Sequence, residues 1–190
     1  DLFSLKTKRA LVIGGAGLLG GEISYGLAEL GAEIIIASPN LKKSCEFVQN
    51  LNERIPGKHL ALEVDVTSGE SIKNLFALIN KVGEGRLDIL VNSGGFGRKN
   101  TFASISDEDW DFDIEIGLSG VFRTIKSAVP LLEKQRGVIL SIASMYGHVA
   151  PDHRMYDGEK YANPPSYGVA KAGIIQLTKY VSSFLAPQGI

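Results

Sequence analysis

Short runs of aliphatic and β-branched residues alternate with longer amphipathic stretches along most of this 190-residue chain. A short apolar run bounded by turn residues is typical of a buried strand, whereas apolar positions three and four apart are typical of a helix. The pattern predicts strands at residues 9–13, 33–37, 59–64, 87–91 and 137–142. It predicts helices at residues 18–30, 42–54, 70–82, 107–133 and 165–185.

Strands and helices that alternate at this spacing pair in parallel through right-handed crossovers. We therefore expect an α/β fold, a doubly wound parallel sheet of the Rossmann type in three α/β/α layers. No repeat, low-complexity tract or linker divides the sequence, which predicts a single dinucleotide-binding domain over residues 1–190. Ligands of such sheets bind beyond the carboxyl ends of the strands.

One stretch interrupts the alternation. Residues 146–165 form a long polar and aromatic segment that contains three prolines. Loops of this length in compact domains are usually functional or mobile. The segment carries charged and titratable side chains, namely those of Asp152, His153, Arg154, Asp157, Glu159 and Lys160. It therefore predicts a polar substrate, such as a sugar derivative, and the alternative is a solvated lid.

Composition narrows the possible partners. Twenty basic and 21 acidic residues leave a net charge of −1, which argues against a nucleic-acid-binding face or a polybasic membrane anchor. No apolar run reaches the roughly 18 residues that a membrane span needs. The single cysteine, Cys45, excludes an internal disulfide and predicts a reducing, cytoplasmic location. Three histidines without ligand spacing predict no metal site.

The first predicted strand is followed directly by a glycine-rich turn that opens the next helix. Here Gly14 permits a tight turn, Gly17 lets the backbone approach a pyrophosphate, and Gly20 lets the helix pack closely on the strand. The N–H groups at the helix start, around Leu18 and Leu19, are suited to an anion. The turn therefore predicts a dinucleotide site, and the alternative is a glycine-rich turn without a ligand.

The end of the second strand distinguishes between the two nicotinamide cofactors. A carboxylate there would accept hydrogen bonds from a ribose hydroxyl and repel a 2′-phosphate. This chain instead has Ser38 and Asn40, followed by Lys42 and Lys43. We expect NADP in preference to NAD, although both lysines are also consistent with a solvated helix start.

The predicted last helix carries Tyr167 and Lys171 four residues apart, so both lie on one face. An ammonium beside a phenol favours the phenolate and lowers the phenol pKa from its usual value of about 10. A tyrosine tuned in this way can exchange a proton with an alcohol or ketone at neutral pH. With Ser144 as a second hydrogen-bond donor, the pair could stabilise the negative charge that develops on a substrate oxygen.

Together these residues resemble the short-chain dehydrogenase/reductase family over essentially the whole chain. The resemblance rests on the glycine turn, the Tyr167–Lys171 pair, and the order and spacing of Asp65-Val66, Asn92-Ser93-Gly94-Gly95, Trp110-Asp111, Gly120-Val121-Phe122 and Ser144.

The resemblance implies a role for each matching residue. It assigns proton transfer to Tyr167, polarisation of the substrate oxygen to Ser144, and binding of the nicotinamide ribose to Lys171. It also implies that the adenine contacts Asp65 and Val66, and that Asn92 and Gly94 line the cofactor bed and brace the fourth strand. Finally, it implies a homodimer or homotetramer formed through the two long helices.

Four departures from the family pattern stand out. The Gly17 spacing resembles the extended branch of the family, which acts on nucleotide sugars. Gly117 stands where the family usually has an asparagine that anchors a proton-relay water, and the segment between Ser144 and Tyr167 is longer than usual. The chain also ends at Ile190, so we expect the C-terminal strands of the family fold to lie outside it.

The residues and the resemblance together predict an NAD(P)-dependent oxidoreductase that transfers a hydride between the cofactor and a small alcohol or carbonyl compound. Two alternatives remain open. The Gly17 spacing favours a nucleotide-sugar epimerase or dehydratase. The Gly117 replacement and the position of the last residue favour a cofactor-binding regulatory protein without catalysis.

Overall fold

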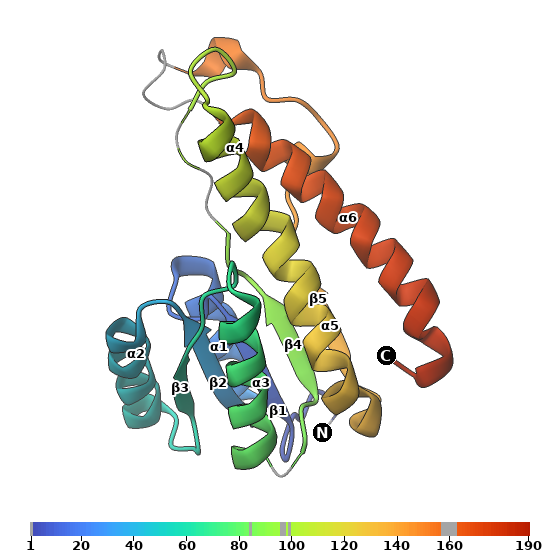
Figure 1. The fold of residues 1–190 in the computed structure, drawn as a ribbon. Helices are drawn as coiled ribbons and strands as arrows, with labels where there is room; N and C mark the ends of the chain where they lie inside the picture. Colours follow the sequence, from blue (N-terminus) through green and yellow to red (C-terminus); the bar gives the residue numbers. More distant parts are fainter. Residues whose placement is uncertain (1, 84, 96–97, 99, 157–162) are drawn as a thin grey trace.

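Five parallel strands form the centre of the protein in the order β3-β2-β1-β4-β5 (Figure 1). The structure is a computed structural model, and it describes residues 2–83, 85–95, 98, 100–156 and 163–190. The strands are β1 (Arg9–Ile13), β2 (Glu33–Ser38), β3 (Leu60–Glu63), β4 (Ile89–Asn92) and β5 (Val138–Ser141). Their bounds lie within one or two residues of the predicted ones, and the doubly wound α/β fold is confirmed.

The helices also follow the sequence pattern closely. Their bounds are α1 (Leu18–Glu29), α2 (Leu41–Arg54), α3 (Gly69–Val82), α4 (Asp107–Ile114), α5 (Gly120–Leu132) and α6 (Pro165–Leu185). Figure 1 shows α4 and the start of α6 beyond the carboxyl ends of the strands, whereas α5 runs beside the sheet.

Two apolar clusters, one on each face of the sheet, form the core. Leu11 and Ile13 of β1 pack with residues of α3, α5 and α6, whereas Ala10 and Val12 pack with residues of α1 and α2. Successive side chains of a strand point to opposite faces, and a parallel sheet is covered on both. This explains why β1 and β2 read as continuous apolar runs and why the predicted three layers form.

The order of the strands places a ligand site above β1. This strand pairs with β2 on one side and with β4 on the other, so that Val12 lies opposite both Ile36 and Val91. The connections from β1 lead to one half of the sheet, and those from β4 lead to the other. A crevice opens at such a reversal, beyond the carboxyl ends of the strands.

The long helical stretch predicted at 107–133 is confirmed, but its middle is not regular α-helix. A π-helical segment, η1 (Glu115–Ser119), separates α4 from α5. The backbone is crowded there: a Cβ on Gly117 would lie 3.1 Å from Cβ of Ala170, and one on Gly120 would lie 2.8 Å from Cγ2 of Val66. The absence of side chains at Gly117 and Gly120 lets the helix pass close to these neighbours. Such π segments occur frequently at functional sites.

The segment predicted as a loop at 146–165 contains two short 3-10 turns, η3 (Met145–Gly147) and η4 (His153–Met155). The predicted loop residues Asp157, Glu159 and Lys160 lie outside the described residues. Within the described part of the chain, none of the helices combines the length and the apolar character that crossing a membrane requires.

A buried histidine ties β2 to the end of α2. Nδ1 of His59 accepts a hydrogen bond from the Ile34 backbone N–H at 3.0 Å, and Nε2 lies 3.1 Å from the carbonyl oxygen of Ile55. Only a neutral ring with its hydrogen on Nε2 satisfies both contacts. Burial lowers the pKa of His59 below 6.5, although the Ile55 carbonyl and the Glu33 carboxylate act in the opposite direction.

We expect the free energy of unfolding to decrease as the pH falls below about 6.5, because His59 then takes up a proton in the unfolded chain but not in the folded one. His59→Asn should flatten this part of the pH dependence, since Asn keeps an acceptor for Ile34 and cannot titrate. Urea unfolding of both proteins at about pH 7.5 and about pH 5.5 measures the difference. An equal loss in both proteins would show that other groups cause it.

Candidate active site

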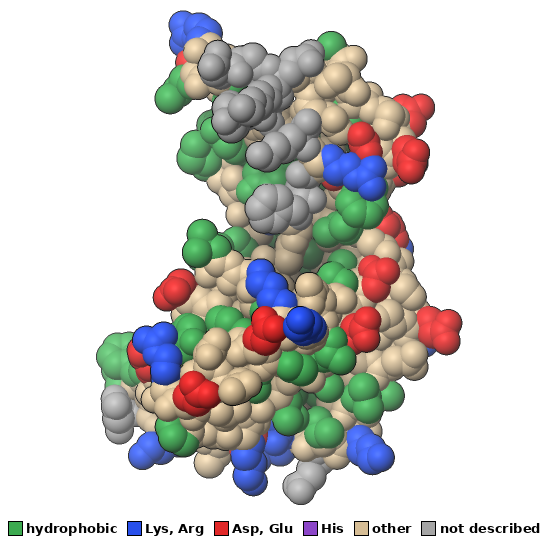
Figure 2. Space-filling view, turned by 90° about the vertical axis from the view of Figure 1, so that its left-hand side faces the viewer, with side chains coloured by type: hydrophobic (Ala, Val, Ile, Leu, Met, Phe, Trp, Pro, Cys, Tyr) green, Lys and Arg blue, Asp and Glu red, His purple; other side chains and the backbone are tan. Residues whose placement is uncertain are grey.

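A crevice of about 800 Å³ lies at the carboxyl ends of the strands, between the sheet and the α4 and α6 helices. Figure 2 views the molecule from the side of α2 and β3. It shows a hollow between the part that contains the sheet and the part formed by the ends of α4 and α6. Most of the residues predicted from the sequence line it: Gly14, Gly17, Leu18, Leu19, Gly20, Ser38, Asp65, Val66, Gly94, Tyr167 and Lys171. Asn92 and Ser144 do not.

The glycine turn at the base of the crevice is held by close backbone contacts. Gly14 has φ +74°, a conformation that favours glycine, and its N–H donates to the Ala37 carbonyl at 2.8 Å. A Cβ on Gly20 would lie 2.4 Å from the Gly14 carbonyl oxygen. Gly17 caps α1 and offers no side-chain hydrogen bond to the first-turn N–H groups. Since the first residues of α1 line the crevice, these N–H groups are available to bind an anion there.

Hydroxyl and amide groups surround the end of β2. Ser38 Oγ lies 2.8 Å from Ser44 Oγ and accepts from the Asn40 backbone N–H at 3.3 Å. The Asn40 side chain accepts from the Lys43 backbone N–H and so caps α2. Lys43 lines the crevice, whereas Lys42 does not. No carboxylate from β2 reaches this end of the crevice among its described lining residues.

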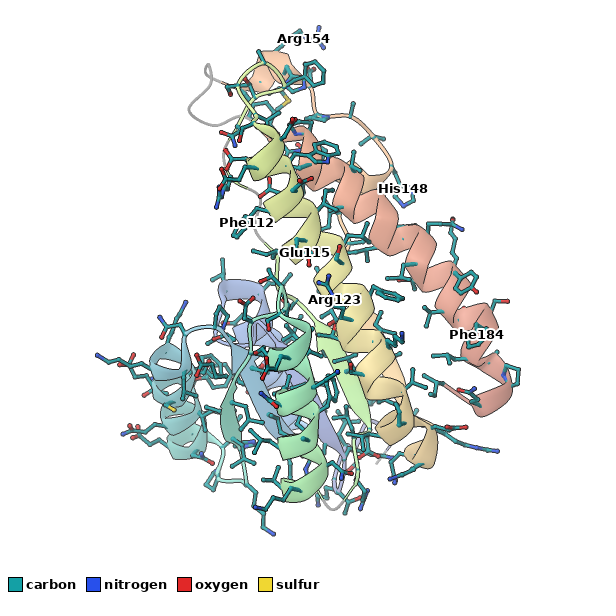
Figure 3. All side chains as sticks on the ribbon, in the orientation of Figure 1. Phe112, Glu115, Arg123, His148, Arg154 and Phe184 are labelled. Atoms are coloured by element: carbon teal, nitrogen blue, oxygen red, sulfur yellow. The ribbon has the colours of Figure 1, made fainter. Side chains whose placement is uncertain are left out.

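The residues that follow β3 border the same end. One oxygen of the Asp65 carboxylate accepts from both the backbone N–H and the hydroxyl of Thr67, at 2.9 and 2.7 Å. The Arg123 guanidinium donates to the Val66 carbonyl at 3.4 Å and forms an ion pair with Glu115, across η1 (Figure 3). The loop that holds Asp65 and Val66 is therefore tied to α5.

The segment after β4 gives the best test of whether a dinucleotide fits. Ser93 Oγ is buried at the crevice wall and has no hydrogen-bond partner among the described residues. A Cβ on Gly14 would lie 3.0 Å from Gly94 Cα and fill the cradle between them. A buried hydroxyl without a partner costs free energy, and an incoming polar ligand would supply the missing contact. The residues present therefore fit the cofactor.

Asn92 lies beneath this segment rather than in the crevice. Its side-chain oxygen accepts from the Thr124 hydroxyl at 2.8 Å, and its amide group donates to Ser141 Oγ at 3.3 Å. The side chain thereby links β4 to α5 and β5. This arrangement braces the fourth strand but places no Asn92 atom in the crevice lining.

Tyr167 and Lys171 enter the crevice from the first turns of α6. The Lys171 ammonium lies 5.6 Å from the centre of the Tyr167 ring and donates to the Ile142 carbonyl at 2.7 Å. Lys171 is only 5% exposed, and burial lowers the pKa of its ammonium below the usual 10.5. The chain thus places a cation and a phenol together in the crevice that the glycine turn also lines.

Ser144 lies at the end of β5 but is engaged differently. Its hydroxyl accepts from the Tyr146 backbone N–H at 3.2 Å and caps η3. No hydrogen bond joins Ser144 to Tyr167 within the described part of the chain. The Ser144 hydroxyl proton remains available as a donor, because this contact uses only an oxygen lone pair.

The polar loop contributes contacts of its own rather than lining the crevice. The Arg154 guanidinium pairs with Asp152 at 2.7 Å and holds the pKa of that carboxyl below its usual range. The Tyr146 and Tyr156 hydroxyls lie 2.9 Å apart. Figure 3 shows Arg154 at the far tip and His148 beside α6, and neither His148 nor His153 is among the crevice residues.

Several residues in the crevice were given no role from the sequence, although Ser93 and Gly95 stand in the Asn92-Ser93-Gly94-Gly95 motif. Ser93, Gly95, Ile142 and Ala143 immediately follow β4 or β5, and that position is a general signal for ligand contact in this fold. Phe112 and Ile116 are four residues apart on the α4–η1 segment and face the same side. Their apolar character made them indistinguishable from core positions.

Comparison with known proteins agrees with this geometry. A model of the short chain dehydrogenase family matches residues 8–190. The 3-oxoacyl-[acyl-carrier-protein] reductase FabG of Staphylococcus aureus is 33% identical over 192 residues, which cover 97% of this chain and 71% of that protein. The FabG of Thermotoga maritima is 32% identical over 191 residues, with 98% and 71% covered.

Solved structures show the same likeness. A short-chain type dehydrogenase/reductase from Mycobacterium marinum has a TM-score of 0.89 at 26% identity, with 100% of this chain and 72% of that chain covered. The NADP active-site complex of RhlG from Pseudomonas aeruginosa has a TM-score of 0.82 at 26% identity, with 99% and 70% covered.

A glycine turn at the carboxyl end of the first strand, below a crevice at the edge of a parallel sheet, is an arrangement found in nucleotide-dependent oxidoreductases. The chain belongs to the short-chain dehydrogenase family, whose members bind NAD or NADP and act on small molecules.

Proposed function

We propose that this chain exchanges a hydride between NADP and the alcohol or carbonyl group of a small polar molecule, with Tyr167 as general acid and base. The observation that carries the proposal is the placement of Tyr167 and Lys171 in the same crevice as the glycine turn. A lone glycine turn or a lone tyrosine has many structural explanations. Their convergence on one crevice supports redox chemistry on a bound nicotinamide.

The first-turn N–H groups of α1 would hold the pyrophosphate, and Asp65 and Val66 would contact the adenine. Gly94 and the unpartnered Ser93 hydroxyl would line the bed on which the cofactor rests. A nicotinamide held there supplies or accepts the hydride.

The chain's own residues manage the proton. During reduction of a carbonyl group, the Tyr167 hydroxyl donates its proton to the substrate oxygen as the carbonyl carbon gains the hydride, and the phenolate regains a proton from water. The buried Lys171 ammonium stabilises that phenolate. Ser144 donates a second hydrogen bond to the same oxygen, which helps to stabilise the negative charge that develops there.

A preference for NADP is supported by the residues at the end of β2. Ser38 and Asn40 present no carboxylate to a 2′-phosphate, and Lys43 lines the crevice beside them. The complex of the similar RhlG contains NADP. Both observations favour a phosphate at this position.

Ser38→Asp should reverse the preference. A carboxylate at the end of β2 repels a 2′-phosphate and accepts hydrogen bonds from a ribose hydroxyl, so the ratio of the NADPH and NADH dissociation constants should change by about tenfold or more. Fluorescence titration with each reduced cofactor measures both constants. An unchanged ratio would place the 2′-phosphate elsewhere.

The polar substrate expected from the sequence stays part of the proposal because the segment between Ser144 and α6 is rich in polar side chains. Its Tyr146 and Tyr156 hydroxyls pair with each other, and Arg154 pairs with Asp152 outside the crevice lining. The names of the FabG relatives point to a 3-oxoacyl carbonyl instead. Both substrates share the carbonyl group on which Tyr167 acts.

A direct screen tests the proposal. The protein is titrated with NADPH and NADH and then supplied with polar ketones, oxidised sugars and a 3-oxoacyl thioester. We expect loss of the reduced-nicotinamide absorbance with a polar ketone. Binding of cofactor without turnover of any compound would favour the regulatory alternative, which the glycine at position 117 first indicated.

We further propose a homodimer or homotetramer. Phe122 of α5 is half-exposed, and Tyr180 and Phe184 on α6, whose rings are stacked, are each 65% exposed. Figure 3 shows Phe184 near the C-terminal end of α6. These apolar side chains on adjacent long helices are suited to contact with another copy. Sedimentation at the monomer mass would contradict this.

The cytoplasmic location expected from the unpaired Cys45 belongs to the same proposal.

A nucleotide-sugar epimerase or dehydratase is the second candidate, because Gly17 holds the middle glycine position seen in that branch and caps α1. Such an enzyme returns its cofactor to the starting oxidation state in each cycle. Absorbance of the reduced nicotinamide would then show no net change during turnover.

A further inference from the structure

A buried carboxyl group joins three segments beside the crevice. Asp113 of α4 is 3% exposed, and Ser166 in the first turn of α6 is fully buried. The Ser166 hydroxyl donates to Oδ2 of Asp113 at 2.5 Å, and the Arg98 backbone N–H donates to Oδ1 at 2.9 Å. A single side chain therefore ties α4 to the start of α6 and to the segment that follows β4.

The side chain of Arg98 strengthens the attachment of that segment. Its guanidinium forms an ion pair with Asp109 of α4 and lies 4.1 Å from the centre of the Phe112 ring. Phe112 in turn lines the crevice, and Figure 3 shows it projecting from α4. The crevice wall near Tyr167 is thus built on contacts that meet at Asp109, Phe112 and Asp113.

The position of Ser166 makes this link relevant to the chemistry, because Ser166 immediately precedes Tyr167. Helix α6 begins at Pro165 after an N-cap, Pro164, that forms no side-chain hydrogen bond. The first turn thus lacks the usual restraint from a capping side chain. The Ser166–Asp113 hydrogen bond fixes that turn against α4 instead.

We propose that Asp113 is a positioning residue, which acts through Ser166 to fix the start of α6 and thereby the place of the Tyr167 hydroxyl in the crevice. The inference rests on the proposed function, because the exact place of this hydroxyl affects turnover only if Tyr167 transfers a proton. Displacements of about 1 Å at a reacting group can reduce a rate about a hundredfold.

Ser166→Ala should lower kcat by about tenfold to a hundredfold and leave the dissociation constant of the reduced cofactor unchanged. Backbone hydrogen exchange, measured without substrate, should become faster in residues 163–170 and stay the same in residues 14–20. If the substitution instead damaged the fold as a whole, kcat and cofactor affinity would decrease together. Ser183→Ala, an exposed position on the same helix, is the matched control and should change neither quantity.

Two variants of Asp113 separate the hydrogen bonds from general packing. Asp113→Asn keeps an oxygen for the Arg98 N–H and offers an amide hydrogen to Ser166 Oγ, so it should retain most of the kcat. Asp113→Ala leaves both donors without an acceptor in a buried place and should lower kcat at least as much as Ser166→Ala.

Wild-type exchange and wild-type kcat in Ser166→Ala would overturn the positioning role, as would a loss of activity in Asp113→Asn equal to that in Asp113→Ala. These results are distinct from failure of the proposed function. Normal turnover by a protein that lacks the Tyr167 hydroxyl would remove the role of Tyr167 itself, whereas the exchange measurement tests the link without any turnover.

Discussion

Tyr167→Phe should reduce turnover by about 10²–10⁴-fold, the range expected when a general acid is removed. Helix α6 places the Tyr167 phenol beside the Lys171 ammonium, in the crevice that the glycine turn also lines. Phenylalanine keeps the ring and its packing but has no proton to donate. Steady-state kinetics of carbonyl reduction measure the change in kcat, and fluorescence titration should show nearly unchanged cofactor affinity.

The matched control lies on the same helix. Tyr180 is 65% exposed and lies outside the crevice, so Tyr180→Phe should leave both kcat and cofactor affinity unchanged. Wild-type turnover by Tyr167→Phe would refute the assignment of the general acid. A parallel loss in both variants would point to damage along α6 rather than to lost proton transfer.

Gly20→Ala should abolish measurable cofactor binding and reduce the free energy of unfolding by about 1–3 kcal/mol. The new methyl group would lie 2.4 Å from the Gly14 carbonyl oxygen, a backbone atom that cannot rotate away. Gly14 is itself held by its hydrogen bond to the Ala37 carbonyl and by its positive φ. The start of α1 must therefore shift, and the N–H groups that we propose bind the pyrophosphate shift with it.

Gly26→Ala provides the control within the same helix, because a Cβ there meets no atom within 4 Å. Alanine in an exposed helix interior is favoured over glycine by up to about 1 kcal/mol, so this variant should be slightly more stable and bind cofactor normally. Thermal unfolding and NADPH titration of both variants give the comparison. Normal cofactor affinity in Gly20→Ala would show that the glycine turn is not the pyrophosphate site.

The strands and most of the crevice could be predicted because they depend on local pattern. Residues 10–13 of β1 and 34–37 of β2 are continuous apolar runs, which a parallel sheet covered on both faces requires. Gly14 follows a strand directly and Gly20 lies in the first turn of the next helix, and that context fixes their place at the carboxyl end of the strand. Tyr167 and Lys171 are four residues apart, and a helix brings them to one face regardless of the rest of the fold.

What the sequence could not predict depends on contacts between distant segments. The π segment at Glu115–Ser119 arises where the helix passes Ala170 and Val66, and nothing in its own residues identifies those neighbours. Asp113 was given no role from the sequence, and its carboxyl group is buried against Ser166, 53 positions away. The direction of the Ser144 hydroxyl is set by the turn at Tyr146, which the family resemblance did not reveal.

Transfer of an isotopic label tests the central claim most directly. Reduced cofactor carrying deuterium at the transferable position of its nicotinamide is incubated with the protein and the best carbonyl substrate, and the alcohol product is examined by mass spectrometry. The arrangement of Tyr167, Lys171 and the glycine turn predicts deuterium on the former carbonyl carbon, together with one oxidised cofactor for each alcohol formed. Product that lacks deuterium, or that forms without net oxidation of the cofactor, would contradict it.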